Sequence, residues 1–142
     1  MIETPNKLTF SEISIGQRES FIVKITESMV EEFGNFSGDL NPLHMDNEFA
    51  ESSQFKKRIV HGMLLATFFS QLIGMRLPGK NALYFSQTLN FRSPCYIDDE
   101  IQIIGEVIEK SDSTRMIIIS TSIFNKSKTC LIDGIAKIIV RS

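Results

Sequence analysis

The period of the hydrophobic positions changes along the chain, which indicates an α-rich first part and a β-rich second part. An apolar-rich stretch at residues 20–25 predicts a first strand. A short helix is expected from Ser28, because Ser28 and Glu31 form a capping-box pattern. The apolar residues that then recur at helical spacing are Met29, Phe33 and Phe36. Gly38 and Pro42 are expected to end this helix.

A longer apolar segment at residues 61–74 predicts a buried helix. Its apolar positions lie nearly all round the helical circuit, at Met63, Leu64, Leu65, Phe68, Phe69, Leu72 and Ile73. Gly74 and the Pro78-Gly79 pair are expected to end the helix. Before it, Asp46 is expected to cap a short helix through Ala50.

The second half of the chain has the composition of β-strands. Segments rich in Ile, Val, Phe and Thr predict strands at residues 83–91, 101–108, 116–124 and 131–140. Short turn-forming segments separate them, which favours antiparallel neighbours because parallel strands need long crossovers. A sheet of about five strands that must cover a buried helix is expected to curl around it. The sequence therefore predicts an α+β domain.

The net charge and the length of the apolar stretches exclude some classes of protein. The 142 residues fit one domain over residues 1–142, and 15 Lys+Arg against 17 Asp+Glu give a net charge of −2. This balance argues against nucleic acid as a partner, because phosphate binding favours a basic surface. The longest apolar stretch, around residues 63–69, is too short to cross a membrane.

The termini and the cysteines point to one compartment. The first seven residues carry no apolar core of signal-peptide length. Cys95 and Cys130 lack metal-ligand or CxxC spacing, so both are expected to be reduced and buried, with a disulfide as the alternative. We therefore expect a cytoplasmic protein.

The stretch at residues 36–46 carries the candidate chemistry. Its turn residues are Gly38, Asn41 and Pro42. Asp39 and His44 are therefore expected on an irregular segment, where a turn brings a carboxylate and an imidazole to one small site. A histidine with an ordinary pKa near about 6.5 exchanges protons close to neutral pH, so the pair fits the polarising of a water molecule. Taken alone, Asp39 also fits an Asx-turn or helix cap, and His44 a loop histidine bonded to backbone.

Other kinds of site have weaker support. The chain has two histidines, His44 and His61, and their spacing matches no metal signature, so no metal is predicted. The sequence has no Gly-x-Ser-x-Gly elbow, no Cys/His nucleophile arrangement and no glycine pattern of a dinucleotide or phosphate loop. No cofactor is therefore expected.

Two blocks of sequence resemble one known family. Ser37-Gly-Asp-Leu-Asn-Pro-Leu-His44 resembles the hydratase-2 motif of the MaoC-like, (R)-specific enoyl-CoA hydratase family. Ile59-Val-His-Gly-Met-Leu-Leu-Ala66 resembles the family's second block, and the resemblance runs over residues 10–140. It implies a single hot dog domain, in which a curved antiparallel sheet wraps a long central helix. It also implies a homodimer with sites at the subunit interface.

The resemblance implies an activity, the reversible hydration of a trans-2-enoyl-CoA to the (R)-3-hydroxyacyl-CoA. On the motif, Asp39 and His44 match the catalytic pair that holds one water against the alkene, and which of them is base and which is acid stays open. The backbone N–H of Gly62 matches the family's oxyanion donor, and a helix N-terminus favours negative charge. The implied partner is an acyl-CoA thioester.

Further positions imply supporting roles. Asn41 is expected to stabilise the catalytic turn. Ser70 matches a family serine that is hydrogen-bonded in the active-site environment, so the resemblance implies a supporting role, with a helix serine bonded back to a carbonyl as the alternative. For His61 we favour a structural or orienting role over proton transfer. The basic cluster Lys56-Lys57-Arg58 is interpreted as solvated surface, with a contact to the phosphates of coenzyme A as the alternative.

Three other functions stay open. A 3-hydroxyacyl-[acyl-carrier-protein] dehydratase would run the same chemistry on another carrier. A hot dog thioesterase would aim a water at the carbonyl carbon rather than at C3 and release a free thiol. Loss of Asp39 or His44 would have favoured a non-catalytic acyl-CoA-binding module, and both residues are present.

Overall fold

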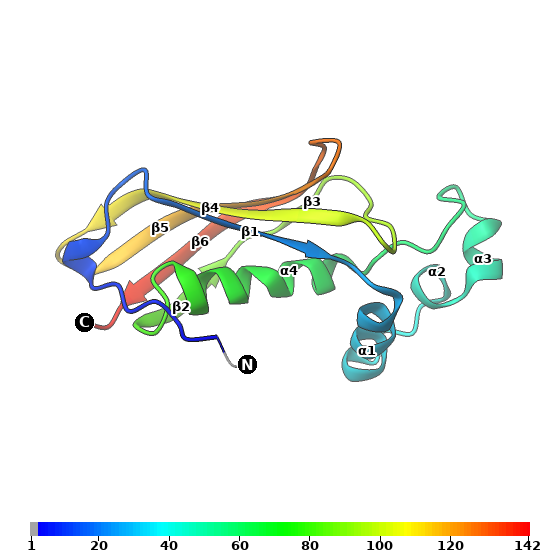
Figure 1. The fold of residues 1–142 in the computed structure, drawn as a ribbon, viewed down its shortest axis with the longest axis horizontal. Helices are drawn as coiled ribbons and strands as arrows, with labels where there is room; N and C mark the ends of the chain where they lie inside the picture. Colours follow the sequence, from blue (N-terminus) through cyan, green and yellow to red (C-terminus); the bar gives the residue numbers. More distant parts are fainter. Residues whose placement is uncertain (1–2) are drawn as a thin grey trace.

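A computed structural model describes residues 3–142. In it, one curved antiparallel sheet wraps around a helix (Figure 1). The strands are β1 (Arg18–Lys24), β2 (Ala82–Gln87), β3 (Asn90–Phe91), β4 (Glu100–Ser111), β5 (Met116–Asn125) and β6 (Cys130–Val140). Their order in the six-stranded sheet is β1-β4-β5-β6-β2, with β3 also paired to β6, and every pairing is antiparallel. The predicted α+β class and the curled sheet are confirmed.

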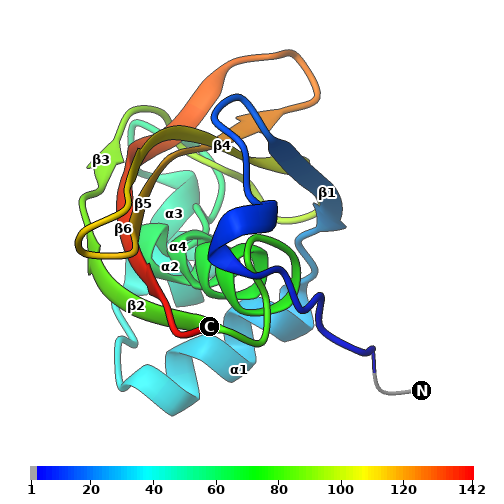
Figure 2. The ribbon, with the colours of Figure 1, turned by 90° about the vertical axis from the view of Figure 1, so that its left-hand side faces the viewer.

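One helix lies along the concave side of the sheet, and the other α-helices gather at one end of the molecule (Figures 1 and 2). The helical segments are η1 (Phe10–Glu12), α1 (Glu27–Ser37), α2 (Pro42–Met45), α3 (Asn47–Glu51), α4 (Gly62–Gln71) and η2 (Leu72–Arg76). The helix on the concave side is α4, which η2 continues as a π-helical turn. The cap that Asp46 was expected to provide for α3 is confirmed, because its side chain accepts hydrogen bonds from two backbone N–H groups.

The predicted strands agree with the structure except at residues 83–91, where two short strands replace one. The ladder of β2 with β6 breaks at Thr88, whose N–H donates to the carbonyl of Ile135 and whose hydroxyl accepts from the Ile135 N–H. Thr88 also lies so close to Gly134 that a Cβ there would be 1.8 Å from the Thr88 carbonyl oxygen. This close approach of the two backbones interrupts the regular pairing. The sheet therefore has six strands rather than about five.

The first helix begins earlier than the capping-box pattern indicates. Thr26, not Ser28, is the N-cap of α1, and its hydroxyl accepts from the Met29 N–H. Glu31 does not complete a capping box, because its carboxylate pairs with Arg58. Gly38 ends α1 as expected, in the left-handed conformation with a φ of 81°.

Pro42 begins a helix rather than only ending one. It occupies the first turn of α2, where a missing N–H is tolerated, and the side chain of Asn41 caps that turn. His44 therefore lies in a short helix. The prediction that it lies on an irregular segment is wrong. Asp39 lies in the turn before it.

Helix α4 buries one side and exposes the other. Leu65 and Phe69 lie in the core. The exposed positions recur three or four residues apart, at Met63, Thr67 and Ser70. The prediction of burial on nearly all faces is wrong for the described chain, because the sheet covers only part of the circumference of α4 (Figure 2). The prediction that Gly74 ends the helix is also wrong, since η2 continues past it to Arg76.

The two cysteines differ in environment. Cys95 is buried, and burial together with the nearby Asp99 raises the pKa of its thiol to about 12. Cys130 is only partly buried, so the expectation of two buried thiols is wrong for this residue; both thiols are free. Across residues 3–142, no helix has the length and apolarity that a membrane crossing requires. The cytoplasmic location stays a prediction.

Candidate active site

The turn between α1 and α2 is built by side chains that bond to the backbone. The Asp39 carboxylate accepts from the Asn41 N–H at 3.2 Å, and the Asn41 side-chain oxygen accepts from the Leu43 N–H at 2.9 Å. Asp39 thus does form the Asx-turn that was the alternative for it. One carboxylate can make this bond and still accept from a ligand, because it has about four acceptor positions.

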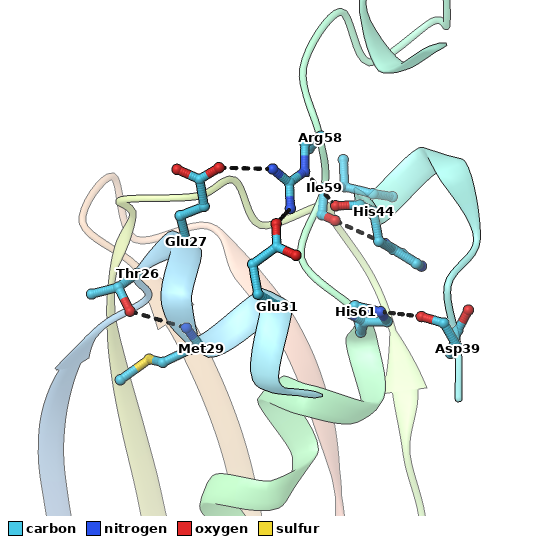
Figure 3. Close-up of polar contacts among 9 residues, drawn as sticks. All are labelled: Thr26, Glu27, Met29, Glu31, Asp39, His44, Arg58, Ile59 and His61. Atoms are coloured by element: carbon cyan, nitrogen blue, oxygen red, sulfur yellow. Dashed lines mark hydrogen bonds and ion pairs between the residues drawn. The ribbon is translucent and has the colours of Figure 1, made fainter. Parts of the chain in front are cut away.

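His44 is held by its ring in one tautomer. Its Nδ1 lies 2.8 Å from the carbonyl oxygen of Ile59 (Figure 3). A carbonyl only accepts, so Nδ1 carries the proton and Nε2 of the neutral ring keeps a free lone pair. His44 can therefore bond to the backbone through Nδ1, as the alternative stated, and still accept a proton at Nε2.

His61 lies beneath this pair at the start of α4. Its Nε2 donates to the carbonyl oxygen of Asp39 at 3.0 Å, and its ring stacks on His44 with centroids 4.1 Å apart and 27° between the planes. The side chain is 2% exposed, and its Nδ1 has no hydrogen-bond partner among the described residues. Burial lowers the pKa of His61, the bond to Asp39 opposes this, and the neighbouring His44 lowers it further. These contacts support the orienting role favoured for His61.

The lowered pKa of His61 predicts a pH-dependent stability. A base whose pKa is lower in the folded state binds protons better when unfolded. The contribution of neutral His61 to the free energy of unfolding is therefore fully present above its ordinary pKa of 6.5 and is lost as the pH falls below it. The melting temperature should therefore fall between about pH 7 and pH 5. His61→Gln keeps a donor for the Asp39 carbonyl and should make the melting temperature less dependent on pH. The carboxylates with lowered pKa, Glu12 and Asp133, titrate below their ordinary values of 4.5 and 3.8, outside this window. An unchanged slope in the variant would contradict the assignment.

The carboxylate of Asp39 and the two imidazoles converge. One ligand atom from each of Asp39, His44 and His61 lies within 4.8 Å of the others. Two hydrogen bonds of about 2.8 Å that meet at one water span about 4.6 Å, so a single water fits between Asp39 and His44. A metal ion needs both imidazole nitrogens aimed at one point about 2.0–2.1 Å away. Stacked rings aim their lone pairs side by side, so these groups fit a water better than a metal.

The N-terminus of α4 adjoins this water position. The Gly62 N–H makes no hydrogen bond with any group in residues 3–142. A hollow of about 240 Å³ is lined by Asp39, His44, His61, Gly62, Met63 and Phe91. A second cavity of about 340 Å³, lined mainly by apolar residues, shares three of these: His44, Gly62 and Phe91. A Cβ on Gly62 would lie 2.6 Å from the Phe91 ring, so glycine is the residue that fits here.

Ser70 and the basic cluster differ from the sequence-based picture. Ser70 lies eight residues after Gly62, about 12 Å along the helix, and its exposed side chain is apart from the converging groups within one chain. Its supporting role stays a prediction. Lys56 and Lys57 line a surface cavity of about 720 Å³ that also holds acidic side chains. Arg58, in contrast, is 4% exposed, so the interpretation of solvated surface is wrong for it.

Sequence reasoning missed Arg58 and Phe91 as neighbours of the site. Phe91 was assigned only to a strand, although its ring covers Gly62. For Arg58, a signal did exist. It directly precedes the apolar Ile59-Val60 pair, and two glutamates four residues apart on α1 present a matching pair of carboxylates.

The fold and the site together define a class of protein, a hot dog domain with a carboxylate and an imidazole beside the N-terminus of its central helix. The chain belongs to the MaoC-like family, since the family model for the MaoC like domain matches residues 12–126. The resemblance read from the two sequence blocks is thereby confirmed.

Individual relatives agree with this membership. The chain is 35% identical over 122 residues to the (R)-specific enoyl-CoA hydratase of Aeromonas caviae. The matched region covers 86% of this chain and 91% of that protein. It is 40% identical over 114 residues to the mitochondrial 3-hydroxyacyl-[acyl-carrier-protein] dehydratase of Arabidopsis thaliana, over 78% of this chain and 68% of that protein. The solved structure of the R-hydratase PhaJ1 from Pseudomonas aeruginosa matches with a TM-score of 0.93 at 33% identity, over 97% of this chain and 88% of that one.

Proposed function

We propose that this protein is an (R)-specific enoyl-CoA hydratase, a hydro-lyase that adds water reversibly to a trans-2-enoyl-CoA to give the (R)-3-hydroxyacyl-CoA. The observation that carries the proposal is that a carboxylate oxygen of Asp39 and a ring nitrogen of His44 lie within 4.8 Å of each other, close enough to share one water, while the bond of Nδ1 to the backbone leaves Nε2 of His44 free. The Gly62 N–H, which has no partner among residues 3–142, lies beside them. The hydratase of Aeromonas caviae, at 35% identity, supports the choice of reaction.

The geometry supports His44 as the base. Its Nε2 takes one proton from the bound water while the water oxygen bonds to C3 and the alkene electrons move to the thioester oxygen. The Gly62 N–H, at the positive end of α4, donates to that oxygen as it becomes negative. The imidazolium then returns its proton to C2, and the carboxylate of Asp39 accepts a hydrogen bond from the O–H that stays on C3. One water is added and both side chains return to their starting state.

Crotonyl-CoA tests this reaction directly. The absorbance of the conjugated thioester should fall after addition of the protein, and chiral analysis should show the (R)-3-hydroxy product. A protein that leaves crotonyl-CoA unchanged, or that releases free coenzyme A thiol as a thioesterase would, contradicts the proposal. Tight binding without turnover would instead support the non-catalytic acyl-CoA-binding module.

A second candidate function keeps the chemistry and changes the carrier. The relative from Arabidopsis thaliana is named a dehydratase of acyl-carrier-protein substrates, and it is 40% identical to this chain. Rates measured with the same acyl group on coenzyme A and on acyl carrier protein separate the two. We expect higher kcat/KM with the coenzyme A thioester, and a large preference for the carrier protein would reverse the assignment.

We further propose that the working form is a homodimer. Strand β2 is the edge of the sheet, and two large apolar side chains on it, Leu83 and Phe85, are 50% and 63% exposed. The exposed side of α4 adds Met63, which is 56% exposed. An unpaired edge strand with an apolar surface favours pairing with another chain.

The dimer proposal predicts the effect of charges on the edge strand. Replacing Leu83 and Phe85 together with lysine should convert a dimer to a monomer in sedimentation equilibrium and lower hydratase activity. Ile22→Lys is the matched control, because Ile22 is an exposed apolar residue on the opposite edge strand, β1. A double variant that stays dimeric and fully active would show that β2 is not the interface.

A further inference from the structure

Arg58 is a buried cation that joins helices α1 and α2 next to the candidate site. Its side chain is 4% exposed, and three of its nitrogens donate to three different groups (Figure 3). Nη1 donates to Glu27 at 3.0 Å and Nη2 to Glu31 at 2.9 Å, both on α1. Nε donates to the backbone carbonyl of His44 on α2. The planar fork of an arginine can make these bonds at once, whereas a lysine cannot reproduce them.

The neighbouring residue completes the hold on His44. The carbonyl oxygen of Ile59 accepts the Nδ1–H of the imidazole, and the Ile59 N–H donates to the carbonyl of Leu43. Arg58 and Ile59 therefore both bond to the backbone of α2, and Ile59 also fixes the ring of His44. The direction of the free Nε2 depends on both contacts, because rotating the backbone of His44 would move the ring with it.

We propose that Arg58 is a positioning residue that aims the His44 imidazole at the bound water. It couples α1, through Glu27 and Glu31, to the backbone of His44. The inference rests on the proposed function only for its effect on rate, since the hold on His44 is a property of the structure itself. Arg58 touches neither the water position nor the Gly62 N–H and acts through His44.

The charge of Arg58 has a second consequence for the site. Its guanidinium opposes protonation of the neighbouring His61, although burial is the main reason why the pKa of His61 is lowered. The His61 ring stacks on His44, so a positive charge on one ring disfavours a positive charge on the other. Arg58 thus adds to the causes, led by burial, that lower the pKa of His61 beneath the His44 ring.

Two substitutions and one control test the proposal. Arg58→Lys keeps a positive charge without the fork, and Arg58→Met removes charge and donors while keeping an apolar stem. Arg18→Met is the control, because Arg18 is 61% exposed and makes one 3.6 Å ion pair with Glu106 on the sheet. The readouts are kcat and KM on crotonyl-CoA, the pH dependence of kcat/KM, and NMR titration of the histidine ring protons. The chain has two histidines, so the spectra report only on His44 and His61.

Arg58→Lys is expected to lower kcat about 10–10²-fold with little change in KM, because a small misplacement of the base affects the transition state more than binding. The histidine resonances should shift in both Arg58 variants and stay in place in Arg18→Met. In Arg58→Met the NMR titration of His61 should move to higher pH, since loss of the cation makes His61 easier to protonate, and the pH dependence of kcat/KM should change with it because the two rings stack.

A folded Arg58→Lys with unchanged kcat and unchanged histidine resonances overturns the proposal, even if its melting temperature falls. If Arg58→Met does not fold, Arg58→Lys decides alone by these two readouts. If the parent protein does not hydrate crotonyl-CoA, the proposed function fails while the histidine spectra still decide whether Arg58 positions His44.

Discussion

His44→Ala and Asp39→Asn are each expected to lower kcat for enoyl-CoA hydration about 10²–10⁴-fold, the usual range for a group that transfers or holds a proton. His44→Ala removes Nε2, the nitrogen of that ring that is not bonded to the backbone. Asp39→Asn leaves the turn intact, because an asparagine oxygen can still accept the Asn41 N–H. Its loss of rate would therefore report on the carboxylate and not on the loop. The measurement is the initial rate of crotonyl-CoA consumption at saturating substrate.

The double variant sharpens the same prediction. If Asp39 and His44 hold one water, removing the second group after the first should cost little, so the double variant should be nearly as active as the worse single variant. Losses that multiply would mean that the two residues act independently. Near-normal turnover in both single variants would rule out this pair as the catalytic centre. Circular dichroism at the assay temperature confirms that the variants are folded.

The strands from β4 to β6 could be predicted because the sequence repeats what the sheet needs. Along β5 and most of β6, buried and less buried residues alternate, which is the period of a sheet with one face on a core. The break at Thr88 could not be predicted in this way. It depends on how closely that residue approaches Gly134, which lies 46 positions later in the chain, and no local pattern records such a contact.

The candidate site shows the same division between local and distant information. The motif between residues 37 and 44 identified Asp39 and His44, because their placement depends on a turn whose residues are adjacent in sequence. The role of Glu31 was misassigned for the opposite reason. A serine three residues before a glutamate satisfies the capping-box rule, but Glu31 is 27 positions from its actual partner, Arg58. The stacking of His44 on His61 likewise joins two elements that only the fold brings together.

Gly62→Pro is expected to lower kcat about 10²–10³-fold relative to Gly62→Ala, the usual cost of losing one oxyanion donor. Gly62 is the first residue of α4, where proline is well tolerated because the N–H there has no partner within the helix. His61 has a ψ of 128°, in the extended range that a residue before proline prefers. Proline at this position therefore removes the N–H and leaves the helix able to form.

The comparison with alanine isolates that N–H. Both substitutions add a Cβ that would lie 2.6 Å from the Phe91 ring, so the side chain of Phe91, a residue that is 56% exposed, has to shift in both variants. Both variants thus share the added Cβ; proline alone lacks the N–H donor, and it also adds the Cγ and Cδ of its ring. Equal kcat values would mean that the thioester oxygen is held by another group. A large difference, with both proteins melting cooperatively, would assign the developing negative charge to the N-terminus of α4, where the dipole and the free N–H act on the same atom.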